Sequence, residues 1–347
     1  MTPTISSTTT EASPPGRAPA TGGSANRRRV LGLLREFALI PPLILVIIVG
    51  AALEPVFATT DNFSNILQQS SELAIVVLAE SLILIAGKFD LSFESTFGFA
   101  VMVGAWLVVP GGYTNGSGLL HSAALGIVIT LGAGVLVGLV NAFLIVKLNL
   151  NAFIITLGML ILLRGVTVGL VNGQTVTGLP NSFTYLGSAR WLGLSAEVWI
   201  AGALYVAVGL WVRYHRAGRA IYAIGGNAEA ARTAGIRVNR ILVSVYVFGG
   251  LLAAFAGLMA VGRFGGVATT QGQNMIFTVF AAAVIGGISL KGGKGSIIGA
   301  LSGVLLLGVV SNLLVLQQVS QYWIDASYGA IILVALAIAK LAGADQD

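Results

Sequence analysis

The sequence predicts an all-α polytopic membrane protein with about ten transmembrane helices, each roughly 20 residues long. Composition is the first observation behind this prediction, because 56% of the 347 residues are apolar and only 9% are charged. A soluble domain carries about 25% charged residues. The mean hydropathy of +0.91 is too high for a soluble globular protein with a single hydrophobic core. The 46 glycines suit helices that pack closely in a bilayer.

Ten apolar runs, separated by more polar segments, are the second observation. Most of them approach the ~20 residues that a helix needs to cross a bilayer. The second and the eighth run are short, and short or interrupted spans often line a transport path. The ten runs cover residues 38–57, 70–86, 93–110, 119–146, 153–172, 196–212, 241–262, 275–290, 295–316 and 323–342.

The distribution of lysine and arginine is the third observation, and it predicts the topology. Cytoplasmic loops carry an excess of these residues. If the chain starts in the cytoplasm and alternates, only Arg190 and Arg263 face outside and Arg164 lies within a span. Of the 19 positive residues, 19 minus 3 leaves 16 in the inside loops. This split predicts an even number of crossings, with the N-terminus and the C-terminus both cytoplasmic.

Composition also divides the chain into a tail and a transmembrane domain. Residues 1–26, which make up most of the expected tail at 1–36, are rich in Ser, Thr, Pro, Ala and Gly and contain no apolar run. This composition is typical of disorder, so we expect a disordered cytoplasmic N-terminal tail. Residues 37–343 form the expected transmembrane domain, with one long inside loop at 213–240. Segments 134–141 and 303–312 resemble each other, which indicates a possible two-half internal repeat of the kind common in transporters.

Functions that need reactive side chains are disfavoured. The chain has no cysteine and two histidines, so disulfides and thiolate metal sites are excluded and a histidine-rich metal site is not expected. Lys294 does not belong to a phosphate-binding loop. That pattern needs Gly where Ile288 stands, and Ser or Thr where Gly295 stands. The spans also lack a clustered acid–base constellation, so we expect no catalytic residue and no metal site in this chain.

The loop at 213–240 contains a predicted short helix. Gly225, Gly226 and Asn227 have the composition of a turn that leads into it, and Asn227 is a typical N-cap residue. Gly235 is the residue type that ends a helix. A short helix between glycines and edged with arginine suits docking on a partner protein. The alternative is a basic loop that only fixes topology.

Four motifs resemble the permease subunits of ATP-binding cassette importers. Residues 229–235, Glu-Ala-Ala-x-x-x-Gly, resemble the EAA-type loop of that family. Residues 87–92 resemble the G-x-x-D-L-S element of the ribose-type, or monosaccharide, branch of the branched-chain amino acid/sugar permease superfamily. Residues 152–158 are similar to its F-I-x-T-L-G span, and residues 286–295 resemble its G-G-x-S-L-x-G-G-x-G loop. The resemblance covers about residues 40–342.

The resemblance implies a transmembrane permease subunit of an ATP-driven importer. Such a subunit would translocate a monosaccharide or similar polyol across the cytoplasmic (inner) membrane of a bacterium. It would not be an enzyme and would hold no cofactor, because ATP and Mg bind to a partner subunit. The family's ATPase-coupling helix corresponds here to Gly226, Asn227, Glu229, Ala230, Ala231, Ala234 and Gly235.

The same resemblance implies the partners of the chain. They are cytoplasmic ATP-binding subunits, a second permease copy or paralogue, an extracytoplasmic solute-binding protein and the lipid bilayer. No nucleic acid is expected among them, because the basic residues follow the membrane topology.

Two alternatives stay open. An ion-coupled secondary transporter would need a carboxylate deep in the spans, and Glu80 is the candidate. Arg164, the other charge well inside a span, would pair with Glu80, line the path or serve the structure alone. A permease of the same superfamily for branched-chain amino acids or nucleosides would show the same motifs.

The candidate solute path consists of polar, charged and aromatic residues in or beside the spans. Neutral hydrogen-bonding groups suit a polyol, whose hydroxyls must exchange water for protein partners. For each polar candidate the alternative is a bridge between helices. The candidates are Asn141, Asn151, Phe153, Thr156, Arg164 and Asn312.

A predicted cytoplasmic turn contains Asp90, Ser92 and Glu94. Lys88 and Glu94 replace glycines of the family pattern. Asp90 and Glu94 are four residues apart and share a helix face. This spacing fits either a paired-carboxylate site for a proton or cation, or a capped helix start with Lys88 as a local counter-ion. We favour the capped start, because we expect the turn at the membrane interface rather than deep inside.

Overall fold

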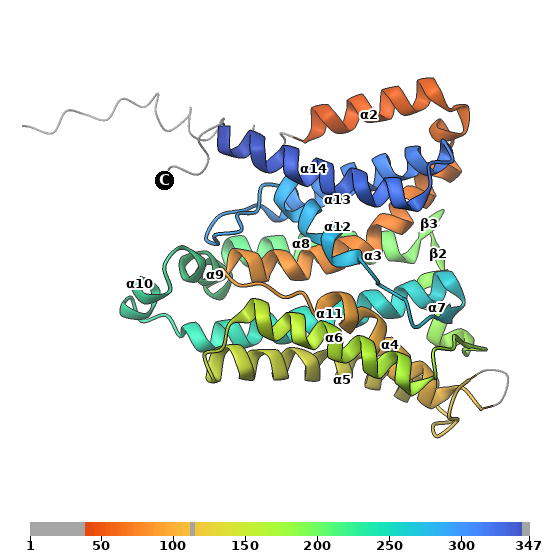
Figure 1. The fold of residues 1–347 in the computed structure, drawn as a ribbon, viewed down its shortest axis with the longest axis horizontal. Helices are drawn as coiled ribbons and strands as arrows, with labels where there is room; N and C mark the ends of the chain where they lie inside the picture. Colours follow the sequence, from red (N-terminus) through yellow and green to blue (C-terminus); the bar gives the residue numbers. More distant parts are fainter. Residues whose placement is uncertain (1–38, 112–114, 342–347) are drawn as a thin grey trace, which may run out of the picture. The chain divides into compact units, whose positions relative to one another are not determined.

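The computed structural model describes residues 39–111 and 115–341 of the chain. The predicted tail at 1–36 lies outside the described residues, as do residues 37–38 and 342–343 of the predicted transmembrane domain. Within the described residues the backbone is helical apart from loops and four two-residue strands. This architecture, drawn in Figure 1, confirms the all-α fold class.

Each of the ten predicted runs lies on a helix of its own. Among the described residues, α3, α5, α6, α8, α11 and α13 are long and apolar enough to cross a membrane, and α2, α4 and α12 are shorter apolar helices. The chain is therefore a multi-pass membrane protein. The ten helices are α2 (Ile40–Leu53), α3 (Thr60–Ile85), α4 (Phe93–Val108), α5 (Ala123–Ala142), α6 (Ala152–Leu170), α8 (Ala196–Tyr214), α11 (Val238–Phe264), α12 (Met275–Ile285), α13 (Ile297–Leu316) and α14 (Gln321–Leu341).

Helix α3 corrects the expectation that the second run is short. The apolar run begins at residue 70, but the helix begins at Thr60 and extends over 26 residues. Its first turns contain polar residues such as Asn62 and Ser64, which are buried inside the protein. A hydropathy pattern misses these turns because their polar side chains face protein rather than lipid. The eighth run, α12, is short as predicted, with 11 residues.

Short elements connect the long helices. The strand pairs β1–β4 and β2–β3 are both antiparallel. The connecting elements are η1 (Pro55–Ala58), the π-helical turn η2 (Phe143–Lys147), α7 (Asn181–Ser188), α9 (Arg216–Gly226), α10 (Ala228–Thr233), β1 (Val176–Thr177), β2 (Arg190–Trp191), β3 (Leu194–Ser195) and β4 (Gly266–Val267).

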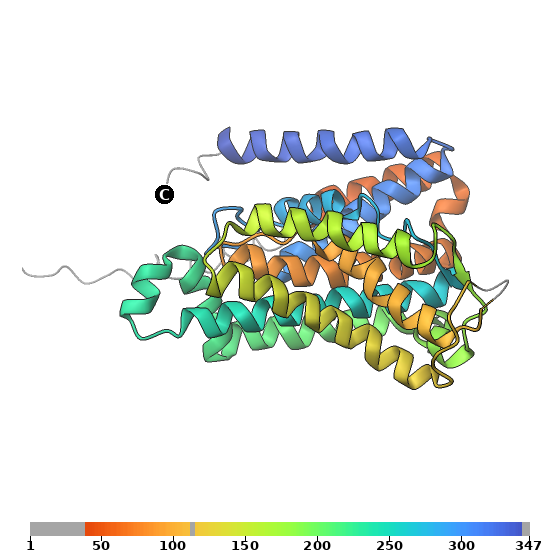
Figure 2. The ribbon, with the colours of Figure 1, turned by 60° about the horizontal axis from the view of Figure 1, so that its bottom comes forward.

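Helices α3 and α11 form the centre of the helix bundle. They pack against each other; α11 also packs on α4 and α5, and α3 also packs on α8, α12 and α13. They are the most buried of the long apolar helices, whereas α6 is largely exposed. Figures 1 and 2 show both helices in the interior, with α2, α5, α6 and α14 around them.

The helix contacts repeat in two groups of four. Helix α4 packs on α5 and α6, as α12 packs on α13 and α14; α11 contacts α4 and α5, as α3 contacts α12 and α13. The similar segments 134–141 and 303–312 lie in α5 and α13, which are equivalent members of the two groups. Helix α3 ends where α11 begins, since Ala86 and Val238 line one cavity. The two groups therefore run in opposite directions, as inverted repeats of transporters do.

The loops separate into two ends of the bundle. At one end, Lys88, Arg232 and Lys291 surround one cavity, and all three belong to loops that the charge count predicts to be cytoplasmic. At the other end, β1 pairs with β4 and the Asn115 side-chain amide donates to the carbonyl of Thr175 at 3.0 Å. These segments belong to loops predicted to lie outside. Alternating crossings require this separation, while the orientation of the two ends stays a prediction.

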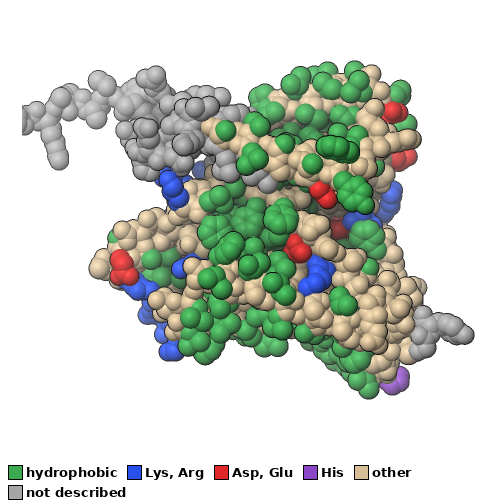
Figure 3. All heavy atoms as spheres, in the orientation of Figure 1, with side chains coloured by type: hydrophobic (Ala, Val, Ile, Leu, Met, Phe, Trp, Pro, Cys, Tyr) green, Lys and Arg blue, Asp and Glu red, His purple; other side chains and the backbone are tan. Residues whose placement is uncertain are grey.

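Much of the lateral surface is apolar. Large hydrophobic side chains of α2, α5, α6 and α8 are exposed, among them Leu45, Leu136, Ile161 and Val206. Figure 3 shows hydrophobic side chains spread over the middle of one face, with charged groups at its two ends and a few among the hydrophobic side chains. Apolar surface on this scale is unfavourable in water and matches the interior of a bilayer.

Candidate functional site

Helix α10, within the predicted docking loop, is a short capped helix. The side-chain oxygen of Asn227 accepts a hydrogen bond from the amide of Ala230 at 2.9 Å. Gly235 follows the helix in the left-handed conformation, with φ of 82°. The predicted N-cap and the predicted helix stop are therefore both confirmed. The expected turn is shorter than predicted, because Gly225 and Gly226 complete α9 and the chain leaves the helix only at Asn227.

The predicted coupling residues form an exposed surface with one buried anchor. Ala231 is buried, and Gly226, Asn227, Glu229, Ala230, Ala234 and Gly235 are exposed. Glu229 pairs with Arg232 on the same surface at 3.1 Å, and both side chains are largely open to solvent. In Figure 1, α10 lies at the end of the bundle, beyond the long helices. Its small and charged side chains are thus available to a partner.

A contact of glycine backbones connects this loop to the membrane helices. A Cβ atom on Gly225 would overlap the carbonyl oxygen of Ile85 at the end of α3. The amide of Gly293 donates to that same carbonyl at 2.8 Å, and Gly292 lies directly against Gly87. We call Gly87, Gly225, Gly292 and Gly293 the glycine junction. Through it, α9 touches both the end of α3 and the loop between α12 and α13.

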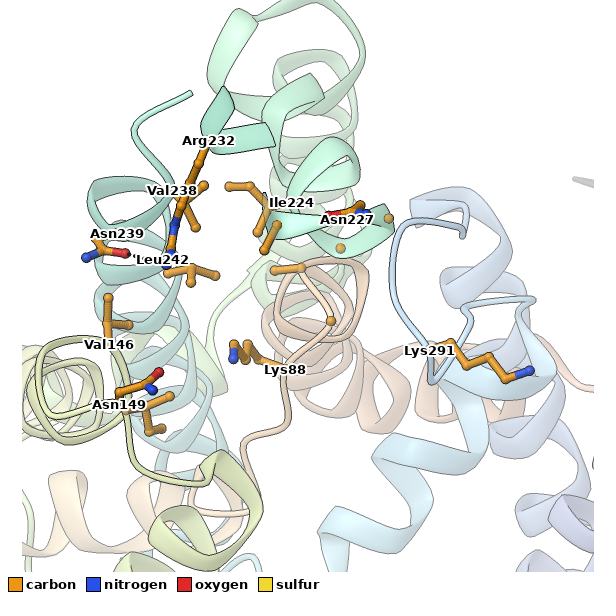
Figure 4. A pocket seen from close by; sticks show the side chains of 16 residues that line it. Lys88, Val146, Asn149, Ile224, Asn227, Arg232, Val238, Asn239, Leu242 and Lys291 are labelled. Atoms are coloured by element: carbon orange, nitrogen blue, oxygen red, sulfur yellow. Dashed lines mark hydrogen bonds between the residues drawn. The ribbon is translucent and has the colours of Figure 1, made fainter. Parts of the chain in front are cut away.

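A cavity of about 270 Å³ opens beside the glycine junction. It lies between α10, the start of α11, η2 and the end of α3, and its polar lining includes Lys88, Asn149, Arg232 and Asn239. In Figure 4, Lys88 points toward Val146 and Asn149, and Arg232 points down toward the start of α11. Helix α10 is therefore not packed solidly against the bundle on this side.

Asp90 orders the segment between α3 and α4. Its carboxylate accepts hydrogen bonds from the amide of Ser92 at 2.8 Å and from the Ser92 hydroxyl. The side-chain amide of Asn141, on α5, donates to Asp90 at 3.1 Å and to the Ser92 hydroxyl at 2.8 Å. All three side chains are buried. Residues 86–92 thus fold back from the end of α3 into the helix bundle.

One expectation about this turn is wrong, and one stays a prediction. Asp90 is fully buried between α3 and α5, while the depth of the turn in the membrane stays a prediction. Lys88 is not its counter-ion, since the ion pairs of the described residues do not include one between them. The turn does precede a helix start as expected, but Asp90 binds the amide of Ser92 rather than an amide within the first turn of α4.

Glu94 and Asp90 have separate partners, so they do not form one paired-carboxylate site. Glu94 forms an ion pair with Arg164 of α6 at 3.3 Å and accepts a hydrogen bond from the amide of Ile276 at 3.3 Å. Arg164 also donates to the carbonyls of Thr269 and Gln271. Arg164 therefore pairs with Glu94 and not with Glu80. A carboxylate here suits the start of both α4 and α12.

The solute-path candidates divide into inward and outward groups. Asn141 binds Asp90, the Thr156 hydroxyl donates to the Ala152 carbonyl at 2.8 Å, and Asn312 exchanges hydrogen bonds with Asn62 at 2.9 Å. These three side chains serve contacts inside the protein.

The outward candidates lie on α6. Asn151 is exposed and caps this helix by accepting from the amide of Ile154 at 3.2 Å. Phe153 is 50% exposed, and 20% of the Arg164 side chain is accessible. The candidates that a solute can reach therefore lie along the open side of α6. Their role in binding a solute stays a prediction.

Sequence reasoning missed an ion pair at the other end of the bundle. Arg263 of α11 holds both carboxylate oxygens of Glu72, on α3, at 2.8 and 2.9 Å. Arg263 lies in a predicted outside loop, and none of the sequence motifs includes Glu72. A glutamate beside a long apolar run was the available signal, but the two residues are 191 positions apart, and no local pattern joins them.

Comparisons with known protein sequences point to one family. A family model described as "Branched-chain amino acid transport system / permease component" matches residues 62–336. The ribose import permease protein of Escherichia coli strain K12 is 38% identical over 310 residues, which cover 88% of this chain and 94% of the relative. The galactose/methyl galactoside import permease protein of the same strain is 32% identical over 326 residues, covering 91% and 97%.

A third relative comes from another organism. The L-arabinose ABC transporter permease protein of Azospirillum brasilense is 34% identical over 284 residues, covering 81% of this chain and 80% of the relative. No solved structure matches the chain. The family match extends from α3 into α14 and includes the glycine junction and α10. With the relatives matched along most of their length, this chain belongs to the family of branched-chain amino acid transport system permease components.

Proposed function

We propose that the chain is the transmembrane permease subunit of an ATP-driven importer that moves a monosaccharide or similar polyol across the cytoplasmic membrane of a bacterium. The observation that carries this proposal is the 38% identity over 310 residues to a ribose import permease. Relatives named for galactose and L-arabinose extend the same substrate class. The solutes for which these relatives are named are all small, neutral and hydroxyl-rich, so we assign this solute class to the chain.

The exposed helix α10 supports ATP coupling through a partner. We infer that α10 docks in a cytoplasmic ATP-binding subunit, which binds ATP and Mg. Closure of two such subunits pushes α10, and α9 passes the displacement to the glycine junction, where Gly225 lies against the Ile85 carbonyl. Packed backbones transmit strain because they cannot yield by rotating a side chain. The displacement then reaches the end of α3 and the loop before α13.

The open side of α6 supports a route along a second permease subunit. Helix α6 packs mainly on α4, and a Cβ atom on Gly158, Gly165 or Gly169 would meet no atom within 4 Å. Small residues on one helix face permit close approach of another helix. We propose that a second copy or a paralogue covers this face and that the solute passes between the two subunits, beside Asn151 and Phe153. An extracytoplasmic solute-binding protein delivers it.

Uptake in proteoliposomes tests the function. The chain is reconstituted with its ATP-binding subunit and solute-binding protein, and accumulation of labelled ribose, galactose, arabinose, leucine and a nucleoside is measured. We expect uptake of one monosaccharide that requires ATP inside the vesicle. Uptake that continues on a proton gradient without ATP would contradict ATP coupling. ATP-driven uptake of leucine or the nucleoside alone would contradict the solute class.

A further inference from the structure

Two buried carboxylates meet between α3 and the segment that returns from it. Glu80, five residues before the end of α3, is fully buried, and so is Asp90. An oxygen of Glu80 accepts the backbone amide of Asp90 at 3.4 Å, so the two side chains belong to one cluster. A buried negative charge is stable only when a cation or sufficient hydrogen bonds compensate it. Two such charges in contact repel each other.

Hydrogen bonds compensate only one of the two carboxylates. Asp90 accepts three of them from Ser92 and Asn141. Glu80 accepts the one from the Asp90 amide, and its second oxygen, Oε2, is buried without a partner. The oxygen of the Asn141 side chain is also buried without a partner, although its amide group binds Asp90. One carboxylate oxygen and one amide oxygen in this cluster therefore lack a donor.

No cation of the described residues reaches Glu80. On α11, Tyr246 is the titratable group beside both carboxylates, and its hydroxyl donates to the carbonyl of Phe89 at 3.3 Å. Lys88 points into the cavity beside Val146 and Asn149 (Figure 4). Helices α12 and α13, which also pack on α3, contain no charged residue. The arginines of α8 and α9 are exposed, and Glu197 of α8 lies beside Glu72 and Arg263 instead.

We propose that Glu80 is a proton-binding site and carries a bound proton when residues 86–92 are docked between α3 and α5. The proton turns Glu80 Oε2 from a buried acceptor without a partner into a neutral hydroxyl, so that no uncompensated charge remains on Glu80. Asp90 stays ionised and keeps its hydrogen bonds. The cluster then holds one negative charge with three donors, instead of two charges that repel.

A proton fits this cluster better than a metal ion does. Hard cations such as Ca²⁺ and Mg²⁺ take about six or more oxygen ligands, whereas the buried side-chain oxygens without a partner in this cluster are Glu80 Oε2 and the Asn141 oxygen. The described residues also contain no group of three or more His, Cys, Asp or Glu side chains that could hold a metal. The proton therefore supplies the missing charge without further ligands.

The site has a consequence for the coupling route. Gly87 of the glycine junction lies three residues before Asp90, so the proton holds in place the segment that joins the junction to α4. Loss of the proton would place two charges against each other and weaken the docking of this segment. This inference does not require the proposed solute, since it concerns the fold of the chain itself. Its failure would leave the transport proposal intact, and failed uptake would leave the proton site intact.

Infrared spectroscopy of the purified full-length chain tests the proposal. Protonated carboxyls absorb apart from carboxylates, so the difference spectrum of wild type and Glu80→Gln isolates the contribution of this residue. Glutamine has the shape of a protonated glutamic acid, and we expect this variant to fold. The expected result at neutral pH is loss of a protonated-carboxyl band in Glu80→Gln and retention of that band in Glu72→Gln. The control removes a buried glutamate of the same helix that is paired with Arg263.

Thermal unfolding at increasing pH provides the second measurement. Folding that takes up one extra proton loses about tenfold in its equilibrium constant per pH unit, where the unfolded carboxyl is ionised. Stability should therefore fall with rising pH in wild type, and the fall should be one proton smaller in Glu80→Gln. Equal pH profiles together with an unchanged infrared band would overturn the proposal. Stabilisation by sodium that disappears in Glu80→Gln would also overturn it, in favour of a metal ion.

Discussion

Single residues define helix α10 by different means. Asn227 starts α10 by accepting the Ala230 amide, and Gly235 ends it with a φ of 82° that side chains rarely adopt. Ala231 anchors it, whereas Glu229 does not, since 81% of its side chain is exposed. The residues that shape the helix and the residues offered to a partner are therefore different.

Glu229→Ala should uncouple transport without destabilising the chain. The exposed pair with Arg232 adds little stability, so the unfolding temperature should stay unchanged. The variant should lower the stimulation of the ATPase by transported solute several-fold, because a contact with the partner is lost. Asp61→Ala is the matched control, because Asp61 is an exposed acid in the first turn of α3, whereas the glycine junction lies at the end of that helix. Normal stimulation in Glu229→Ala would contradict the docking role of α10.

Glu94→Gln should destabilise the packing of α6 against α4. Arg164 would keep its two carbonyl contacts but lose its partner carboxylate, whose side chain is only 7% exposed. Leaving one member of a buried pair alone costs about 3–5 kcal/mol. Denaturant unfolding should show this loss, and Glu94→Gln with Arg164→Met should recover part of it. A double variant that is as unstable as the sum of the single variants would show that the pair is not coupled.

At the scale of elements, glycine positions decide which helices can touch. A Cβ atom on Gly134 of α5 would overlap the carbonyl oxygen of Gly250 on α11, whereas Gly132 of the same helix has open space. The many glycines of the sequence alone indicated close helix packing. The sequence did not identify the neighbouring helix.

Gly134→Ala and Gly132→Ala form a matched pair on α5. Alanine at 134 should separate α5 from α11 and cost about 1–3 kcal/mol, as overpacking does. Alanine at 132 should leave stability unchanged or raise it by up to about 1 kcal/mol, since alanine is the better helix former. Unfolding of both variants in the same detergent measures the difference. Equal stabilities would show that α5 and α11 do not pack as the structure has them.

At the scale of the whole molecule, the open side of α6 distinguishes this helix from the central ones. Cysteines introduced at Gly158 or Gly165 should cross-link two permease subunits in membranes, because the proposed partner covers this face. The chain has no native cysteine, so each product is specific. Gly202 and Gly209 of α8 also have open space and serve as controls facing lipid. Cross-links at the α8 positions alone would move the interface to that helix.

The sequence by itself determined the helices, their division by polar loops, the family and the two ends of α10. Each of these depends on hydropathy, composition or neighbours within a few residues. Only the tertiary structure decided the partners of buried polar groups. Arg164 forms an ion pair with Glu94 rather than with Glu80, and Asn312 forms hydrogen bonds with Asn62, which lies 250 positions away in the sequence. Such pairs form where helices distant in sequence cross, and no local pattern encodes the crossing.

The polar start of α3 has the same explanation. Its residues looked unsuited to a span because they are polar, yet they are buried by neighbouring helices that the local sequence does not reveal. The returning segment at 86–92 is likewise held inside the bundle by α5 and α11, through hydrogen bonds from Asn141 and Tyr246. Local sequence therefore determined which segments are helices. Packing determined the burial and the partners of each side chain, because both depend on several segments at once.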